Sequence, residues 1–313
     1  MVTVCYRLSV ALCCASLACF SFPAHAQVAL DELRPLPAAR AQQMKSLPSP
    51  AQRAVKPLYT HPPRPEAFPV PPSDLATHTT LAVGVQVSDY HYQERRVGLP
   101  PVDVKVDGFK GGATVNATGA LGYGWFTRAE GRVAGGPVDY KGSGNSNKEP
   151  DYLGELRITG GWDWIGDDVA ISPIVGVGYR ILRNDGRGQT TTGAWGYQRQ
   201  SQYLFLPIGL QPRIRLSNGD QIRANLEYDY LLKGWQDSHL EVGGLSNVRN
   251  SQYHGLGLRG ELLYSRDRWS LGPFVNYWNI QDSKMKYLSW GSGLEPQNQT
   301  LEIGLQLRYN LYQ

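Results

Sequence analysis

The chain has 313 residues, a formal net charge of +4, 41% hydrophobic residues and 11% aromatic residues. The modest positive charge is dispersed and gives no reason to expect a nucleic-acid partner. Beyond the N-terminal segment, no apolar run approaches the roughly 18 residues that a membrane-spanning helix needs.

The N-terminus has the pattern of a secretory signal peptide over residues 1–26. Arg7 precedes an apolar run over 8–22, and Ala24-His25-Ala26 forms a cleavage site before Gln27. The alternative, a lipoprotein site that acylates Cys19, is disfavoured because Ser16 stands where Leu is usual. All four cysteines lie inside the signal, so the mature chain would have no disulfides, thiolate metal sites or cysteine nucleophiles.

Residues 27–76 form a separate region with eleven prolines and little hydrophobic periodicity. Proline removes backbone donors and stiffens the chain toward polyproline II, so the region is predicted to be an extended, disordered arm in the periplasm. It would act as a spacer or make weak contact with an anionic surface.

Residues 77–313 are predicted to form an all-β domain. Ten segments alternate polar and apolar residues with a period of two, which indicates strands with one apolar face. They are 79–93, 106–118, 125–140, 151–164, 169–183, 197–214, 221–233, 251–264, 269–281 and 299–312. Short and long connections alternate between them, as in outer-membrane barrels. The expected fold is a transmembrane antiparallel up-and-down β-barrel of about ten strands with short periplasmic turns and long extracellular loops.

The last segment resembles the closing strand of bacterial outer-membrane barrels. Apolar residues from Leu301 to Leu311 share one face, and the other face carries Glu302 and Arg308. Such strands usually end on Phe, whereas this chain ends on Gln313.

Charge placement indicates which face points inward, because a soluble barrel with an apolar core shows the same period. Arg or Lys in contact with lipid at the membrane midplane costs about 2–4 kcal/mol, so the charged face must line the lumen of a spanning barrel. The residues predicted inside are Arg128, Glu130, Arg132, Glu155, Arg157, Arg180, Arg223, Glu227, Asp229, Lys233, Arg259, Glu261, Glu302 and Arg308.

The eight tryptophans are predicted to form two interfacial belts, as outer-membrane barrels carry at both water interfaces. One belt, at the short turns, comprises Trp125, Trp162, Trp164 and Trp269, and the other, at the long loops, comprises Trp195, Trp235, Trp278 and Trp290.

No motif predicts a cofactor or a metal. Gly176-Val177-Gly178 lacks the third glycine and the helix of a dinucleotide fingerprint, and small residues facing the lumen explain it better. The five histidines of the mature chain do not stand at metal-ligand spacing.

One constellation resembles an active site. Asp237 and His239 follow the seventh strand, and a ten-stranded barrel with an Asp-x-His pair at that point resembles the omptins, which are outer-membrane endopeptidases. The resemblance implies a water-activating Asp–His pair at the extracellular rim, completed by an Asp-x-Asp pair after the third strand. Asp139 matches the first of those acids, but Lys141 replaces the second, which disfavours proteolysis. Asp89-Tyr90-His91 is a second Asp-x-His in the chain, so the motif is weakly specific.

The same ten-stranded fold is similar to a neisserial-type adhesin, whose outer loops bind host glycans. The rim here is modestly basic, which suits contact with lipopolysaccharide phosphates or binding of a sulfated glycan. We therefore expect an integral barrel of a Gram-negative outer membrane with a surface, structural or ligand-binding role. An omptin-like endopeptidase and a small porin are the alternatives. The expected partners are outer-membrane lipid and lipopolysaccharide, the barrel assembly machinery and an extracellular ligand at the loops.

Overall fold

The computed structural model describes residues 74–96, 102–289 and 291–312. The predicted signal peptide, most of the proline-rich region, Trp290 and Gln313 lie outside the described residues.

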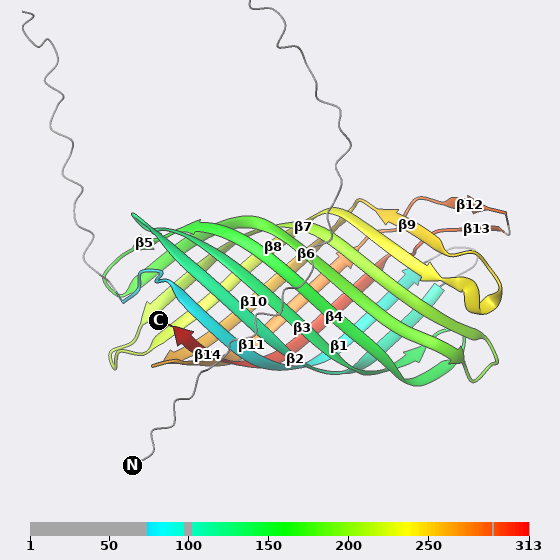
Figure 1. Cartoon of the computed structure of the whole chain (residues 1–313), viewed down its shortest axis with the longest axis horizontal. Coiled ribbons are helices and arrows are strands. Elements are labelled where there is room, and N and C mark those ends of the chain that lie inside the picture. Colours follow the sequence, from blue (N-terminus) through cyan, green and yellow to red (C-terminus); the bar gives the residue numbers. More distant parts are fainter. Residues whose placement is uncertain (1–73, 97–101, 290, 313) are drawn as a thin grey trace, which may run out of the picture. The chain divides into compact units, whose positions relative to one another are not determined.

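Within these ranges the chain forms a closed antiparallel barrel of ten long strands (Figure 1). Each strand pairs with its neighbours in chain order, β14 pairs with β1, and β8 pairs with β10, so no edge of the sheet is open. The predicted up-and-down barrel is confirmed. The strands are β1 Thr80–Arg96, β2 Val102–Gly122, β3 Trp125–Lys141, β4 Asn145–Trp162, β6 Val169–Gln189, β7 Trp195–Arg215, β8 Gln221–His239, β10 Gly255–Arg266, β11 Trp269–Ile280 and β14 Asn298–Tyr312.

Shorter elements extend the wall at its two ends. At one end, β9 (Val248–Gln252) pairs with β8, the hairpin of β12 (Lys286–Leu288) and β13 (Gly291–Gly293) lies nearby, and a 3-10 helix covers Leu240–Gly243. We call this the loop end. The other, the turn end, holds β5 (Trp164–Ile165), the short turns and the C-terminus (Figure 1). Among the described residues, no helix is long and apolar enough to cross a membrane.

Several strands reach further toward the loop end than predicted. Residues 145–150, 184–189 and 234–239 were expected in loops but belong to β4, β6 and β8. Apart from Pro150 and Trp235 they are glycines or polar residues on both faces, so they show no hydrophobic alternation, yet backbone pairing continues through them. The barrel wall therefore continues beyond its apolar portion.

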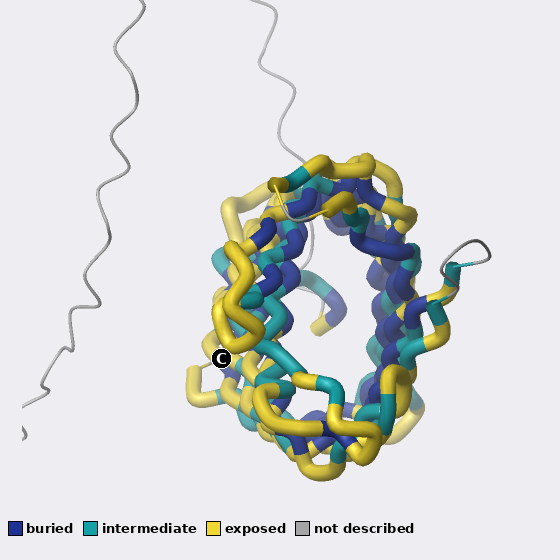
Figure 2. Tube along the Cα trace, turned by 90° about the vertical axis from the view of Figure 1, so that its right-hand side faces the viewer, coloured by how far each residue is buried: buried dark blue, intermediate teal, exposed yellow. Residues whose placement is uncertain are grey.

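The two faces of the wall differ sharply in chemistry. The outer face carries an apolar band in which Val85, Leu156 and Leu305 are 60%, 57% and 55% exposed. Seen from the loop end, the inner side of the tube is lined largely by buried residues (Figure 2). Almost all of the charges predicted inside are indeed buried or partly buried on the lumen face. The polarity deduced from the sequence is therefore confirmed.

Lys233 is the exception, because a β-bulge changes the alternation of β8. Leu204 pairs with Lys233 and Phe205 pairs with Leu231, which leaves Leu232 as an extra residue. Beyond the bulge the buried positions of β8 are even-numbered, beginning with Gly234. Lys233 therefore lies on the outer face, with its ammonium 5.0 Å from the Trp235 ring centroid.

The tryptophan belts are only partly as predicted. All four turn-end tryptophans are exposed on the outer face, as expected for a belt. At the loop end Trp195 is exposed and Trp235 is partly buried. Trp278 is 1% exposed and lies in the lumen, because it shares the inward parity of Phe274 on β11. Its place in a belt was a wrong prediction.

Candidate functional site

The three candidate catalytic residues lie on the outer face of the wall. Val138 and Ser238 are the buried, inward neighbours, so Asp139 and the pair Asp237 and His239 point away from the lumen. Strands β4, β6 and β7 separate β3 from β8, so the structure does not bring Asp139 to the Asp–His pair.

Both aspartates already have hydrogen-bond partners on the outer face of the wall. Asp139 Oδ1 accepts the Lys148 backbone N–H at 3.0 Å. Asp237 accepts hydrogen bonds from the Arg249 guanidinium at 2.6 Å and from the Gln202 amide at 2.9 Å. Asp237 is therefore held by a cation and an amide.

The histidine of the second Asp-x-His motif, His91, also has hydrogen-bond partners. His91 contacts Asp107 through Nδ1 at 2.8 Å and Asp89 through Nε2 at 2.9 Å, on the outer face beyond the apolar band. The hydrogen bond to Asp107 is the main cause that raises the pKa of His91; burial opposes it, and the hydrogen bond to Asp89 adds to the rise. Because both ring nitrogens face carboxylates, the imidazolium form is favoured, and in that form the ring has no lone pair with which to take a proton from water.

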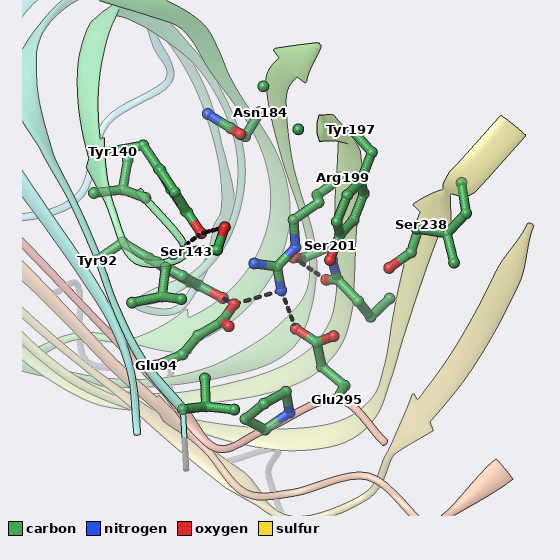
Figure 3. A pocket seen from close by; sticks show the side chains of 18 of the residues that line it. Tyr92, Glu94, Tyr140, Ser143, Asn184, Tyr197, Arg199, Ser201, Ser238 and Glu295 are labelled. Carbon is green, nitrogen blue, oxygen red and sulfur yellow. Dashed lines mark hydrogen bonds and ion pairs between the residues drawn. The ribbon is translucent and has the colours of Figure 1, made fainter. Parts of the chain in front are cut away.

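A cavity of about 360 Å³ opens inside the loop end of the barrel (Figure 3). Its walls combine tyrosine rings and aliphatic side chains with a few charged groups. The aromatic residues include Tyr92, Tyr140, Trp195 and Tyr197, and the aliphatic residues include Val104, Val106, Leu182, Val248 and Leu294.

A bridge of two acids and one base crosses this cavity. Arg199 contacts the carboxylates of both Glu94 and Glu295 through the same nitrogen, and the Tyr92 hydroxyl donates to Glu94 at 2.6 Å (Figure 3). The Glu295 backbone N–H donates to the Ser283 hydroxyl at 2.8 Å, which fixes the loop that carries Glu295.

The two acids compete for one cation. Burial raises the pKa of Glu295 to about 8, and the nearby Glu94 carboxylate adds to the effect while Arg199 opposes it. Glu295 is therefore largely protonated at neutral pH and can donate a hydrogen bond.

Glu149 adds a further acid to the cavity wall. It is 7% exposed, and burial raises its pKa. Among the described residues it has no Lys or Arg partner, whereas its neighbour Asp151 is paired with Lys110 at 2.5 Å. The lining thus holds more acidic than basic side chains, and Glu149 is the acid whose charge no described cation neutralises.

An apolar layer that meets the cavity lining at Leu182 forms a floor between the cavity and the middle of the lumen. Trp278 stacks on Tyr203 with ring centroids 5.9 Å apart and meets Phe205 edge-on at 5.1 Å. Gly178 makes room for this layer, because a Cβ there would lie 2.2 Å from the Phe205 ring. The predicted role of this glycine as a small lumen-facing residue agrees with that contact.

Below the floor, ion pairs fill the middle of the lumen. Arg157 contacts Glu130 at 2.5 Å and also Glu227, and Arg132 contacts Glu302 at 2.5 Å. These side chains come from four different strands, β3, β4, β8 and β14, so they connect opposite parts of the wall. The cavity at the loop end is therefore closed from below.

Sequence reasoning missed the residues of this cavity. Arg199 and Glu94 keep the inward parity of β7 and β1, which was a usable signal, but both lie past the apolar part of their strands. Glu295 lies in a connection with no periodic pattern, so nothing in the sequence places it beside Arg199. Among the described residues, no group of three or more His, Cys, Asp or Glu side chains could hold a metal ion.

Comparison with known proteins identifies the fold. No protein-family model matches the chain, and no curated protein matches its sequence. The outer membrane protease OmpT from Escherichia coli is similar in structure, with a TM-score of 0.51 and 10% identity over 75% of this chain and 98% of that chain. The β domain of the Bordetella autotransporter BrkA gives a TM-score of 0.38 and 11% identity over 74% of this chain and 99% of that one. The chain thus has the fold of an omptin-type outer-membrane β-barrel. At 10% identity, the likeness to OmpT extends to the fold alone.

Proposed function

We propose that this protein is an integral barrel of a Gram-negative outer membrane whose loop-end cavity binds a small amphipathic ligand that carries a cationic group. The observation behind the proposal is the cavity itself, which is closed below, is lined by tyrosines and aliphatic side chains, and has more acidic than basic side chains in its lining. Binding pockets for small molecules commonly combine apolar walls with a few polar groups that fix orientation.

The cavity chemistry supports a cationic ligand over an anionic one. Arg199 neutralises Glu94, Glu295 is largely protonated at neutral pH, and Glu149 is left with no Lys or Arg partner in the described part of the chain. Tyrosine faces attract cations through the ring quadrupole, by about 0.5–2 kcal/mol in partly dry sites. A ligand with an apolar body and an ammonium or guanidinium group would therefore find both of its parts matched.

The outer surface supports the membrane location. The apolar band and the turn-end tryptophans suit a lipid phase with an aromatic belt. The polar wall above the band would meet lipopolysaccharide, with basic groups such as Arg183 near its phosphates. Insertion would depend on the barrel assembly machinery, and the cavity would face the exterior.

A ligand-binding function is better supported than a porin function or a protease function. Ion pairs and the Trp278 layer occupy the lumen, so we expect low, intermittent conductance in planar bilayers. Stable open channels, of the size seen for a large porin, would favour the porin. The separation of Asp139 from Asp237 and His239 disfavours a site of the kind implied by the omptin resemblance.

The proposal is tested with a matched pair of organic ions. Titration calorimetry of the refolded protein in lipid nanodiscs should detect saturable binding of benzyltrimethylammonium and none of benzenesulfonate. Glu149→Gln should weaken binding of the cation about tenfold, or about 1.4 kcal/mol, because the carboxylate that would face the trimethylammonium charge is replaced by a neutral amide. Glu241→Gln is the control, since Glu241 is exposed at the same end but does not line the cavity. Equal binding of both ions, or of neither, would contradict the proposal.

A further inference from the structure

A second cavity, of about 380 Å³, lies at the turn end of the lumen and plays no part in the proposed function. It is lined by the turn-end parts of many strands, including Thr80 of β1 and Asn310 of β14. The ion pairs in the middle of the lumen separate it from the loop-end cavity.

The segment before β1 frames this cavity. The Thr77 backbone N–H and hydroxyl donate to the Asp163 carboxylate at 2.5 and 2.9 Å, and Arg213 donates to the Thr77 hydroxyl and to Asp163 at 2.5 Å. Leu75 is fully buried, and the Asp74 carbonyl accepts the Gln221 amide at 2.9 Å. Residues 74–76, predicted as the last part of the disordered arm, are thus fixed at the mouth of the barrel.

Four arginines line the cavity, and nearby carboxylates form salt bridges with two of them. Arg213 pairs with Asp163, and Arg308 pairs with Glu261, each at 2.5 Å. The lining acid Glu130 pairs with Arg157, which belongs to the central network.

The other two arginines form no salt bridge among the described residues, although the Glu130 and Glu261 carboxylates attract Arg128 from a longer distance. Arg128 donates to the Thr118 hydroxyl at 3.1 Å and to the Gln211 amide oxygen at 2.8 Å, which are neutral groups. Arg223 donates only to the Gln221 amide oxygen, at 3.1 Å, and the charges that act on it are those of Arg213, Arg128 and Arg308. Its two terminal nitrogens have no hydrogen-bond acceptor in the described part of the chain.

We infer that the turn-end cavity binds a small oxyanion, a phosphate or a carboxylate, between Arg128 and Arg223. Guanidinium groups donate in a planar fork that fits two oxygens of such a group. A bound anion stabilises partly buried cations that repel one another more than it stabilises exposed cations, because the local dielectric constant is low. The ligand would enter from the side on which the C-terminus lies.

Titration calorimetry in nanodiscs tests this inference, with inorganic pyrophosphate and succinate as separate probes for the phosphate and the carboxylate. At least one probe should bind saturably to the full-length protein. Arg223→Gln and Arg128→Gln should each weaken that binding about tenfold or more, since a charge-assisted hydrogen bond is lost. Arg223→Lys should bind with intermediate affinity, because it keeps the charge but loses the fork. Arg266→Gln, an exposed turn-end residue outside the cavity, should bind as wild type.

Two results would overturn the inference. One is the absence of saturable binding of either probe by the wild-type protein. The other is binding that survives in the folded Arg223→Gln variant, which would place the anion elsewhere. Heat-modifiable gel migration establishes that each variant is folded, and Arg223→Lys serves in place of Arg128→Gln if removal of Arg128 prevents folding.

Discussion

Arg157 is the residue whose loss should most clearly expose how the lumen is held together. It is 6% exposed and contacts Glu130 at 2.5 Å, Glu155 at 3.7 Å and Glu227. Arg157→Met keeps much of the side-chain volume but removes a positive charge that neutralises these carboxylates. Removal of one partner from a buried ion pair costs about 3–5 kcal/mol, because the charge that remains stays desolvated.

The assay is urea unfolding in lipid vesicles, followed by tryptophan fluorescence and by the heat-dependent shift on a gel. We expect Arg157→Met to lose about 3–5 kcal/mol of unfolding free energy. Addition of Glu227→Gln should restore part of that loss, since it removes one unpaired charge. Arg187→Met is the matched control, because Arg187 is exposed at the loop end and its one salt-bridge partner among the described residues is Asp185. A loss below about 1 kcal/mol for Arg157→Met, the value typical of surface pairs, would refute the claim that these ions act as a buried network.

Three further outcomes are expected. Leu305→Arg should reduce the folded yield in vesicles, because it places a charge in lipid at a cost of about 2–4 kcal/mol. The control variant Leu305→Ala should fold. A normal folded yield of Leu305→Arg would show that the outer face is misassigned. The refolded protein with lipopolysaccharide should not cleave basic peptides, and robust hydrolysis that disappears in His239→Ala would establish the protease instead. Affinity for benzyltrimethylammonium should rise between pH 6 and 9 as Glu295, with its pKa raised to about 8, loses its proton, and a pH-independent affinity would contradict this. Because burial disfavours the ionised form of Glu295 in the folded state, stability should fall as the pH rises from about 4.5 to about 8 and level off above that, and Glu295→Gln should abolish this fall.

The sequence contained enough information for the barrel but not for its cavities. A period of two is a local signal, so the strands, the lumen charges and the turn-end tryptophans followed from it. One inserted residue, Leu232, reverses that signal, which is why Lys233 was assigned to the wrong face. Trp278 was assigned to a belt by its position near a loop, although its parity on β11 directs it into the lumen.

The cavities depend on contacts between residues far apart in the chain. Arg199 meets Glu295 across 96 positions, and the connection that carries Glu295 has no periodicity from which its path could be inferred. Thr77 meets Asp163 in the same way, which no composition argument about a proline-rich arm could anticipate. The omptin resemblance pointed to Asp139, Asp237 and His239, but the alternation of β3 and β8 places all three on the outer face.

Amide chemical shifts of the nanodisc-embedded protein during titration with benzyltrimethylammonium test the central claim most directly. Saturable shifts should be confined to residues that line the loop-end cavity, such as Tyr92, Tyr140 and Arg199, and should be absent at the turn end. Shifts that do not saturate, or that spread over the outer apolar band, would contradict the assignment of a ligand site inside the barrel.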